Sequence, residues 1–492
     1  MKVYGTEQIK KDLVWYLAGA VLPMLVLLLR SPIFTRVFSP SEYGQYTLVY
    51  LVFLYLSVVK LEWIRTSIWR YYLKYQRRGQ NQRFWQAVSA FFLLSGGLIA
   101  IVTLFWYLGT ANPAARELIV WGGANIITQE LITILLIPKR IEGKSAYYNI
   151  VNGAKAAISF ILLLVMTFLY DVGIFAFFMA PALVNLAFLA YLIPGSGFSL
   201  LPRFNLLAIN DLKRFGRYGL AGTLTMTATY LLISSDRWIV NFYWGLDKTG
   251  IYNQTYMLGQ MSIMAMITVL NASFNPYLLN NLERNRKNSD EFISNAFRWY
   301  FYLILPMAVY ISLYAKPLSI VLLGPDFREA WFIIPFITFS FLLEGLCHFS
   351  SIKLKFFNQL TPLYLGVIIA TVANVLLNLL LVPRLGYSIA AHTTLASYII
   401  LFTYYYFRAR SSFLHRAQNR KIILVIITVL LLQVAAHFII RPMWEEVNLF
   451  AATTIELILF TAVYIAATLS VSPWRGQKSI QLPGAAAAED RR

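Results

Sequence analysis

Long apolar runs recur along the whole chain, and they constrain its fold more than any other feature. Fourteen runs are long enough for a helix to cross a bilayer. The chain is 59% hydrophobic and 13% charged, which is more apolar surface than a water-soluble protein of 492 residues can cover. The sequence therefore predicts an all-α polytopic membrane protein with about 14 transmembrane helices. The runs span residues 13–38, 46–64, 86–109, 115–137, 146–170, 172–193, 216–243, 250–281, 293–315, 329–352, 361–382, 387–407, 422–440 and 447–470.

The distribution of basic residues orients these spans. With the N-terminus placed in the cytoplasm, thirty of the 42 Lys and Arg residues fall on the inner side and eight on the outer side. Basic residues concentrate in cytoplasmic loops, so both termini are predicted to be cytoplasmic. The same bias accounts for the net charge of +20 without a nucleic-acid partner. The run at 13–38 is too long for a cleavable signal peptide, and we expect it to remain as the first span.

Short outer loops and isolated histidines argue against an enzyme. The longest predicted outer segment surrounds KPLSIVLLGPDFRE, which is too short to form a catalytic domain. No metal-ligand spacing, nucleotide-binding loop or catalytic triad is recognisable in the sequence. A single cysteine, Cys347, excludes an internal disulfide. We therefore predict no catalytic residue, no metal and no cofactor, and a membrane glycan polymerase or ligase is the less favoured alternative. The four histidines occur singly, at His348, His392, His415 and His437.

An internal repeat divides the chain. The stretches RSPIFTRVFSPSEYGQYTLVY and RWIVNFYWGLDKTGIYNQTYM each place an Arg before a span end and a Gly-x-Tyr at the start of the next span. Such repeats indicate two related six-helix lobes, which in transporters alternate access to a site between them. Four residue pairs share an offset of 206 to 214 positions: Gly44 with Gly250, Arg30 with Arg237, Gly173 with Gly386, and Glu130 with Glu344. The predicted units are an N-terminal lobe (1–193), a cytoplasmic linker (194–216), a C-terminal lobe (217–407), two additional helices (408–470) and a disordered cytoplasmic tail (471–492).

Three motifs in chain order resemble the polysaccharide-exporter branch of the MOP (multidrug/oligosaccharidyl-lipid/polysaccharide) superfamily. They are PIFTRVFSPSEYGQYTLV, SSDRWIVNFYWGLDKTGIYNQTY and ANVLLNLLLVPRLGYSIAAHTTLASYII. The resemblance implies a Wzx-type flippase with two six-helix lobes around a cationic cavity. Its substrate would be an undecaprenyl-diphosphate-linked oligosaccharide, an O-antigen, capsule or exopolysaccharide unit, moved across the bacterial inner membrane. The alternative within the superfamily is a multidrug or small-metabolite exporter.

Charges inside the spans are the candidate functional residues, because a charge at mid-membrane costs at least about 2.5–3.5 kcal/mol on insertion scales. Guanidinium groups bind phosphate oxygens bidentately, so an arginine from each lobe would suit a diphosphate. The competing interpretation is structural pairing between helices, or snorkelling to the interface for residues near inner span ends. The candidate anion ligands are Arg30, Arg237, Lys155, Lys60 and Arg298.

The acidic residues in the spans have different predicted roles. Asp236 and Arg237 lie about 100° apart on a helix, so we expect them not to face one another and each to have its own partner. Asp236 would then orient Arg237. Glu130 and Glu344 are candidates for coupling to H⁺ or Na⁺, and a Glu130–Lys155 pair is the alternative for Glu130. Membrane lipids and a glycan polymerase are the other expected partners.

Overall fold

The computed structural model describes residues 28–199, 201, 206–284 and 289–409, with six single positions nearer the two ends. Within these residues all regular structure is helical, as predicted. The elements are α2 (Pro40–Arg77), α3 (Asn81–Gly109), α4 (Pro113–Ile141), α5 (Ser145–Phe168), α6 (Ala176–Leu192), α7 (Leu206–Arg284), α8 (Ser289–Leu313), α9 (Ala315–Leu322), the 3-10 helix η2 (Pro325–Ile333), α10 (Ile334–Phe356), α11 (Leu360–Leu385) and α12 (Ile389–Arg408).

Several predicted segments fall outside the described residues. They are half of the first span (13–38), most of the span at 422–440, the whole span at 447–470 and the tail (471–492). The end of the first span is described, and it is helical over residues 28–34.

The described helices have the length and composition of membrane spans. Seven helical segments are long and apolar enough to cross a membrane, and α6 is apolar but shorter. Large apolar side chains along α3 are exposed, as expected for a helix face that meets lipid rather than water. These include Leu94, Ile101, Leu104, Phe105 and Leu108. The protein is therefore a multi-pass membrane protein.

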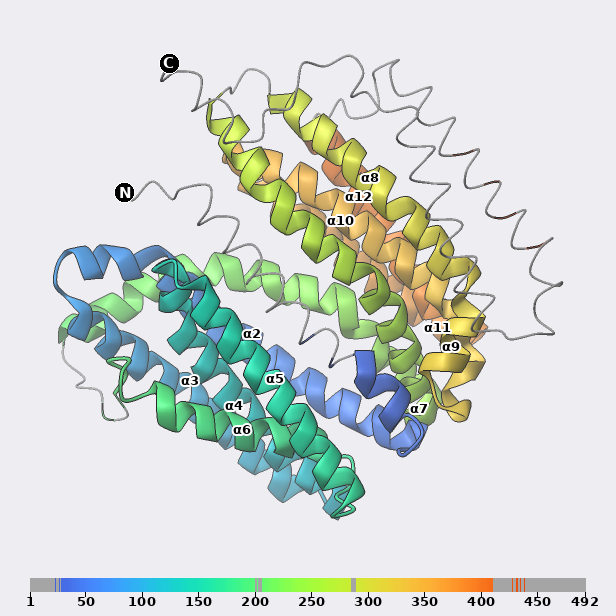
Figure 1. The fold of residues 1–492 in the computed structure, drawn as a ribbon, viewed down its shortest axis with the longest axis horizontal. Coiled ribbons are helices and arrows are strands. Elements are labelled where there is room, and N and C mark those ends of the chain that lie inside the picture. Colours follow the sequence, from blue (N-terminus) through green and yellow to red (C-terminus); the bar gives the residue numbers. More distant parts are fainter. Residues whose placement is uncertain are drawn as a thin grey trace, which may run out of the picture.

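The predicted spans 216–243 and 250–281 are the two limbs of one long element, α7. At Gly245 the backbone has φ 78° and ψ −177°, a conformation that only glycine adopts readily. Figure 1 shows the first limb crossing the molecule and the second limb turning back from this point. A sharp turn at one glycine thus takes the place of the loop expected between these spans.

The start of α2 is set by its own sequence. The hydroxyl of Ser39 accepts a hydrogen bond from the Glu42 backbone N–H at 3.3 Å, and the Ser39 N–H donates to the Glu42 carboxylate at 2.8 Å. This capping box satisfies backbone groups that a helix start leaves unpaired, and Pro40 suits the first helical position. The SPSE tetrapeptide therefore ends the first span and begins the second.

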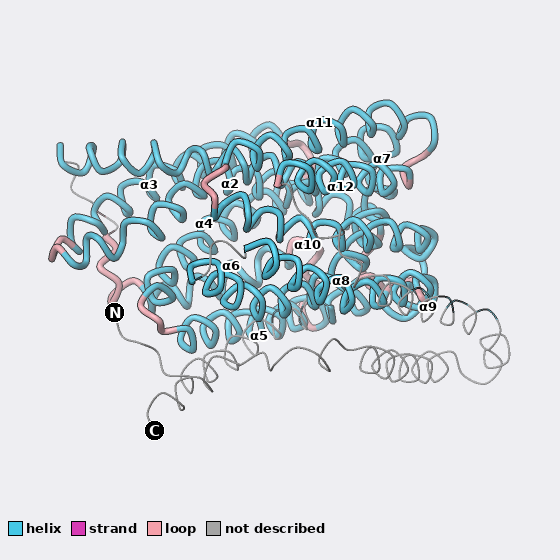
Figure 2. The backbone as a smooth tube through the Cα atoms, turned by 90° about the horizontal axis from the view of Figure 1, so that it is seen from above, coloured by secondary structure: helices cyan, strands magenta, loops and turns pink. Residues whose placement is uncertain are grey.

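The described helices gather in two groups, with α3–α6 on one side and α8–α12 on the other (Figure 1). Between them α2 and the first limb of α7 run antiparallel along their length. Tyr55 and Ser234 are joined by a hydroxyl–hydroxyl bond of 2.8 Å, and Ser67 donates to the Phe215 carbonyl at 3.0 Å. Figure 2 shows the same helices from above, with α3 towards one side and α9 towards the other.

The hydrophobic core is continuous across both groups of helices. A smaller cluster lies within the second group, around Leu232, Leu354 and Tyr398. The proposed lobe boundaries, 1–193 and 217–407, stay a prediction.

Candidate functional site

Asp236 and Arg237 lie on the first limb of α7, and both are buried, with 0% and 3% of their surface exposed. One guanidinium nitrogen of Arg237 is 2.7 Å from the Asp236 carboxylate, and Nε donates to Asn253 at 3.3 Å. The Tyr252 hydroxyl donates to the other oxygen of Asp236 at 2.6 Å. The guanidinium carbon of Arg237 also lies 3.7 Å from the ring centroid of Tyr256. The two charges therefore sit in a fully partnered polar cluster.

The expectation that Asp236 and Arg237 cannot face one another is wrong. Their Cβ atoms point in different directions around the helix, but the arginine side chain is long enough to turn back along it. Its guanidinium reaches the carbonyl of Ile233, one helical turn earlier, and there it meets the Asp236 carboxylate. The expectation that Asp236 orients Arg237 agrees with this contact. The predicted role of Arg237 as a diphosphate ligand stays a prediction.

Arg30 lies near the end of the first span and is half-buried. Its guanidinium carbon is 4.4 Å from the ring centroid of Phe177 on α6, so a cation–π contact holds it. Arg30 and Arg237 thus each rest on an aromatic ring, Arg30 on α6 and Arg237 on Tyr256 in the second limb of α7. Within the described residues, no hydrogen bond or ion pair joins the two arginines.

Glu130 and Lys155 do not form the pair considered as an alternative. Glu130 is 5% exposed; it accepts a hydrogen bond from Ser57 at 2.8 Å and lies 3.5 Å from a guanidinium nitrogen of Arg65. Lys155 is 8% exposed and donates to the side-chain oxygen of Gln129. Glu130 pairs with Arg65 of α2 instead of Lys155, because α2 packs directly on α4.

The two remaining basic candidates are half-buried. Lys60 lies on α2, and its backbone carbonyl accepts a hydrogen bond from the Trp63 indole at 2.6 Å. Arg298 lies on α8 and donates to the Ser294 hydroxyl at 3.1 Å, one helical turn away. The structure does not join either of them to Arg237.

Glu344 on α10 lies in a different setting. One of its carboxylate oxygens is buried and receives no hydrogen bond within the described residues. The hydroxyls of Tyr256, Tyr300 and Tyr398 are also buried and unpaired there. The Tyr300 hydroxyl lies against Gly345, and the rings of Tyr256 and Tyr398 both contact Phe341 on the same helix. We call Glu344 and these three tyrosines the Glu344 cluster.

The outer end of the molecule is closed by backbone contacts. We use "outer end" for the end where α2 and the second limb of α7 begin, after the predicted orientation, and "inner end" for the opposite one. A Cβ added to Gly44 would overlap the carbonyl oxygen of Leu246, and one added to Gly250 would overlap that of Pro40. Each glycine therefore packs on the residue four positions before the other. Small residues permit such close helix contacts in membranes.

Two further contacts close the same end. The Gly324 N–H donates to the Thr35 hydroxyl at 2.7 Å, and a guanidinium nitrogen of Arg36 donates to the Val321 carbonyl at 3.1 Å. These bonds tie the end of the first span to the segment between α8 and α10.

A family model described as "Polysaccharide biosynthesis protein" matches residues 33–332, which is more than half of the chain. The chain belongs to this family. A search of curated proteins finds no matching relative. The matched region covers both glycines of the outer contact and both limbs of α7, and the resemblance to the MOP superfamily is confirmed.

Solved structures share the fold of this polysaccharide biosynthesis family member. The lipid II flippase MurJ in an inward closed conformation matches with a TM-score of 0.70 and 16% identity, covering 92% of this chain and 98% of that chain. The MATE transporter VcmN of Vibrio cholerae matches with a TM-score of 0.58 and 13% identity, covering 84% and 97%. An inward-facing multidrug resistance MATE transporter of the MOP superfamily matches with a TM-score of 0.58 and 15% identity, covering 80% and 98%. These proteins are a flippase and transporters rather than enzymes.

Sequence reasoning missed a buried polar network in this family member. Ser235 donates to Asn374 at 3.3 Å, Asn378 donates to Asn374 at 3.1 Å, and Thr393 donates to Asn378 at 2.6 Å. The network joins α7, α11 and α12, and all four side chains are buried. Two asparagines four positions apart in an otherwise apolar span are the signal that marks it.

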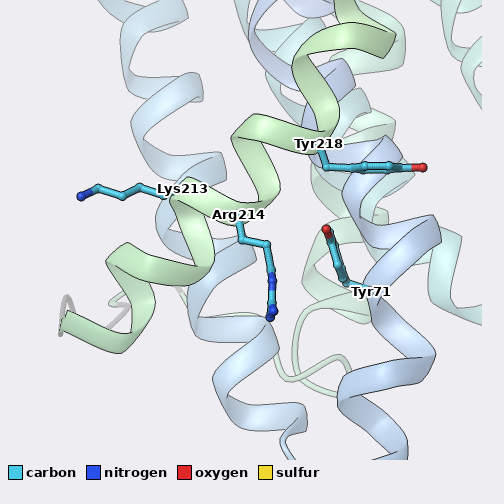
Figure 3. Close-up of a pocket in the computed structure, with 4 residues that line it drawn as sticks. All are labelled: Tyr71, Lys213, Arg214 and Tyr218. Atoms are coloured by element: carbon cyan, nitrogen blue, oxygen red, sulfur yellow. The ribbon is translucent and has the colours of Figure 1, made fainter.

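A pocket at the inner end was also missed. It has a volume of about 470 Å³ and is lined by Tyr71 of α2 and by Lys213, Arg214 and Tyr218 of α7. In Figure 3 the two tyrosines approach each other from the two helices, and Arg214 extends beside Tyr71. The basic and aromatic stretch DLKRFGRYG, assigned to the linker and the start of the next span, carries three of the four residues.

Proposed function

We propose that this protein is a flippase for an undecaprenyl-diphosphate-linked oligosaccharide, moving it from the inner to the outer leaflet of the bacterial cytoplasmic membrane by alternating access. The glycan would be the repeat unit of an O-antigen, capsule or exopolysaccharide. The observation that carries this proposal is membership in a polysaccharide biosynthesis family on a fold shared with a lipid II flippase. Both termini would be cytoplasmic.

The two ends of the molecule support the proposed direction of transport. The outer end is held closed by the Gly44 and Gly250 contacts, whereas the inner end carries an open pocket with basic residues. Basic residues at this surface would attract an anionic lipid headgroup in the inner leaflet. The chain as a whole has 42 Lys and Arg residues against 22 Asp and Glu residues.

A coupling cation, H⁺ or Na⁺, forms part of the proposal. Glu344 supports it, because one oxygen of its carboxylate is buried without a hydrogen-bond partner among the described residues, which is costly unless that oxygen binds a cation. The neighbouring tyrosine hydroxyls would supply further oxygen ligands.

Deleting the gene tests the proposed function. The deletion strain is expected to accumulate the lipid-linked glycan on the inner leaflet and to lose the surface polysaccharide, and expression of the wild-type chain should restore both. Mass spectrometry of lipid extracts measures the accumulation. A deletion strain with normal surface glycan and no accumulated intermediate would overturn the proposal.

The second candidate function is export of a drug or small metabolite. The fold shared with MATE transporters and the buried carboxylates of Glu130 and Glu344 favour it. Under this alternative, the deletion strain would become sensitive to cationic drugs while its surface polysaccharide stayed intact. Growth in a panel of such drugs distinguishes the two functions.

A further inference from the structure

The inner-end pocket has Arg214 among its lining residues, and Arg70, which is not a lining residue, contacts the rings of its two tyrosines. The guanidinium carbon of Arg70 lies 4.1 Å from the ring centroid of Tyr218 and 5.9 Å from that of Tyr71. The guanidinium carbon of Arg214 lies 5.9 Å from the Tyr71 ring. Tyr71 also stacks on Phe215, with ring centroids 5.1 Å apart, so its ring position is fixed. The pocket therefore has aromatic walls with arginines beside them.

Within the part of the chain that the structure describes, no ion pair neutralises the positive charge at this pocket. None of the ion pairs formed within the described residues includes Arg70, Lys213 or Arg214. The carboxylate nearest in sequence, Asp211, is buried and is bound by Arg83 at 2.6 Å. Arg70 and Arg214 are exposed, so their N–H donors that point away from the rings are available to a ligand.

The pocket lies at the level of lipid headgroups. Tyr71 is 31 residues beyond Pro40, the first residue of α2, which corresponds to about 46 Å along a straight helix. The hydrocarbon core of a bilayer is only about 30 Å thick. With Pro40 at the outer end, residue 71 has passed through the core and reached the inner headgroup region.

We propose that this pocket is the loading site for the transported lipid: it binds the diphosphate headgroup at the inner leaflet before translocation. Arg70 and Arg214 bind the phosphate oxygens, since guanidinium and phosphate match in geometry and charge. Tyr71 and Tyr218 present their hydroxyls to the first sugar. Lys213, which extends to the other side of α7 in Figure 3, adds to the local positive potential. This inference rests on the proposed flippase function, and in it the inner-end pocket is the site that binds the substrate before translocation.

Binding to purified full-length protein in nanodiscs of neutral lipid tests the inference. The probes are undecaprenyl diphosphate, phosphatidylglycerol and inorganic pyrophosphate. The double variant Arg70→Gln/Arg214→Gln is expected to raise the Kd for undecaprenyl diphosphate about tenfold or more, because two charge-assisted contacts are lost. The control variant Lys74→Gln/Arg77→Gln removes the same charge from exposed positions of α2. Within the described residues neither Lys74 nor Arg77 makes the contact with the Tyr71 and Tyr218 rings that Arg70 makes, so its Kd should stay near that of the wild type.

The outcomes separate the loading site from the proposed function. An equal Kd for wild type and Arg70→Gln/Arg214→Gln, with both eluting as monodisperse protein, overturns the loading site but leaves the function standing if the deletion strain accumulates lipid-linked glycan. An equal loss with the control variant also overturns it, because the effect is then one of net charge. Equal affinity for phosphatidylglycerol, or for pyrophosphate alone, overturns the assignment to a lipid diphosphate. Absence of accumulated glycan in the deletion strain overturns the function, whatever the pocket binds.

Discussion

Two neighbouring residues, Asp236 and Arg237, show how a membrane interior holds full charges. The pair is buried, and each member has at least one additional hydrogen bond or ring contact. Removing one partner of a buried pair leaves the other without compensation, which is far costlier than removing both.

We expect the Arg237→Gln variant to lose about 3–5 kcal/mol of stability, because Asp236 then stays buried without its counter-charge. The double variant Asp236→Asn/Arg237→Gln should lose less than either single variant, since no net charge remains. Thermal unfolding of the purified Asp236→Asn, Arg237→Gln and double variants in one detergent measures these differences in stability. An Arg237→Gln protein that is as stable as the wild type but fails to export glycan would contradict a structural role and favour phosphate binding.

Glu344 makes a different prediction, because its buried oxygen has no hydrogen-bond partner within the described residues. The Glu344→Gln variant should be at least as stable as the wild type, since a costly buried carboxylate is removed. Its transport should no longer respond to an H⁺ or Na⁺ gradient. Transport by proteoliposomes with and without each gradient measures the effect.

The matched control is Glu117→Gln, which removes the same charge from an exposed position on α4. It should transport like the wild type. Unchanged gradient dependence in Glu344→Gln would remove Glu344 from the coupling mechanism.

At the scale of elements, hydropathy predicted where helices cross lipid but not where they end. The span predicted at 46–64 belongs to a helix that runs from Pro40 to Arg77. Apolar residues mark only the part of a helix inside the hydrocarbon, and the polar turns beyond it follow capping chemistry such as that of Ser39 and Glu42. The break between the spans 216–243 and 250–281 was predicted, because Asp247 and Lys248 interrupt the apolar pattern, but its form as a turn at Gly245 within one continuous helix was not.

The contact between α2 and the second limb of α7 depends on two glycines. The Gly44→Val and Gly250→Val variants should fold but fail to close the outer end, because the added side chain would overlap a backbone carbonyl of the other helix. Glycan export by either variant should fall at least about tenfold, since each transport cycle requires the outer end to close.

A thiol probe reports the closure directly. A Thr35→Cys substitution should react faster with a membrane-impermeant maleimide in the Gly44→Val background than in the wild-type background, and buried Cys347 should not react in either. The matched control is Gly97→Val on α3, where an added Cβ meets nothing within 4 Å. Equal labelling rates in all backgrounds would show that the glycine contact does not control the outer end.

At the scale of the whole molecule, closure of the outer end should be separable from folding. Arg36 and Val321 are both exposed and are joined by a hydrogen bond, so cysteines at these positions lie within reach of a flexible cleavable crosslinker. Crosslinked Arg36→Cys/Val321→Cys protein should stop transport in proteoliposomes and recover when the crosslink is cleaved. The single-cysteine variants should transport throughout, and transport by the crosslinked protein would contradict alternating access at this end.

The long-range contacts were beyond what the sequence could predict. The internal repeat drew attention to Gly44 and Gly250, but their reciprocal packing depends on how two helices cross. The Asp236–Arg237 pairing likewise depends on a side-chain rotamer, and the Glu130–Arg65 contact depends on which helix packs beside α4. Sequence patterns predicted the charged residues of interest, whereas their partners came from tertiary structure.

The contacts at the two ends of the molecule differ in how strongly they depend on the ionic strength of the solution. Backbone packing at Gly44 and Gly250 loses a quarter to a half of its dispersion energy over a gap of about 0.5–1 Å, so this closure behaves as an all-or-none latch. Dispersion does not depend on dissolved ions, whereas the attraction of an anion to Arg70 and Arg214 weakens as the Debye length shortens. The glycine contact itself is therefore insensitive to salt and acidity. The exposed Lys248–Glu329 ion pair at the same end, 2.6 Å long, and the proposed loading site at the opposite end both respond to ionic strength.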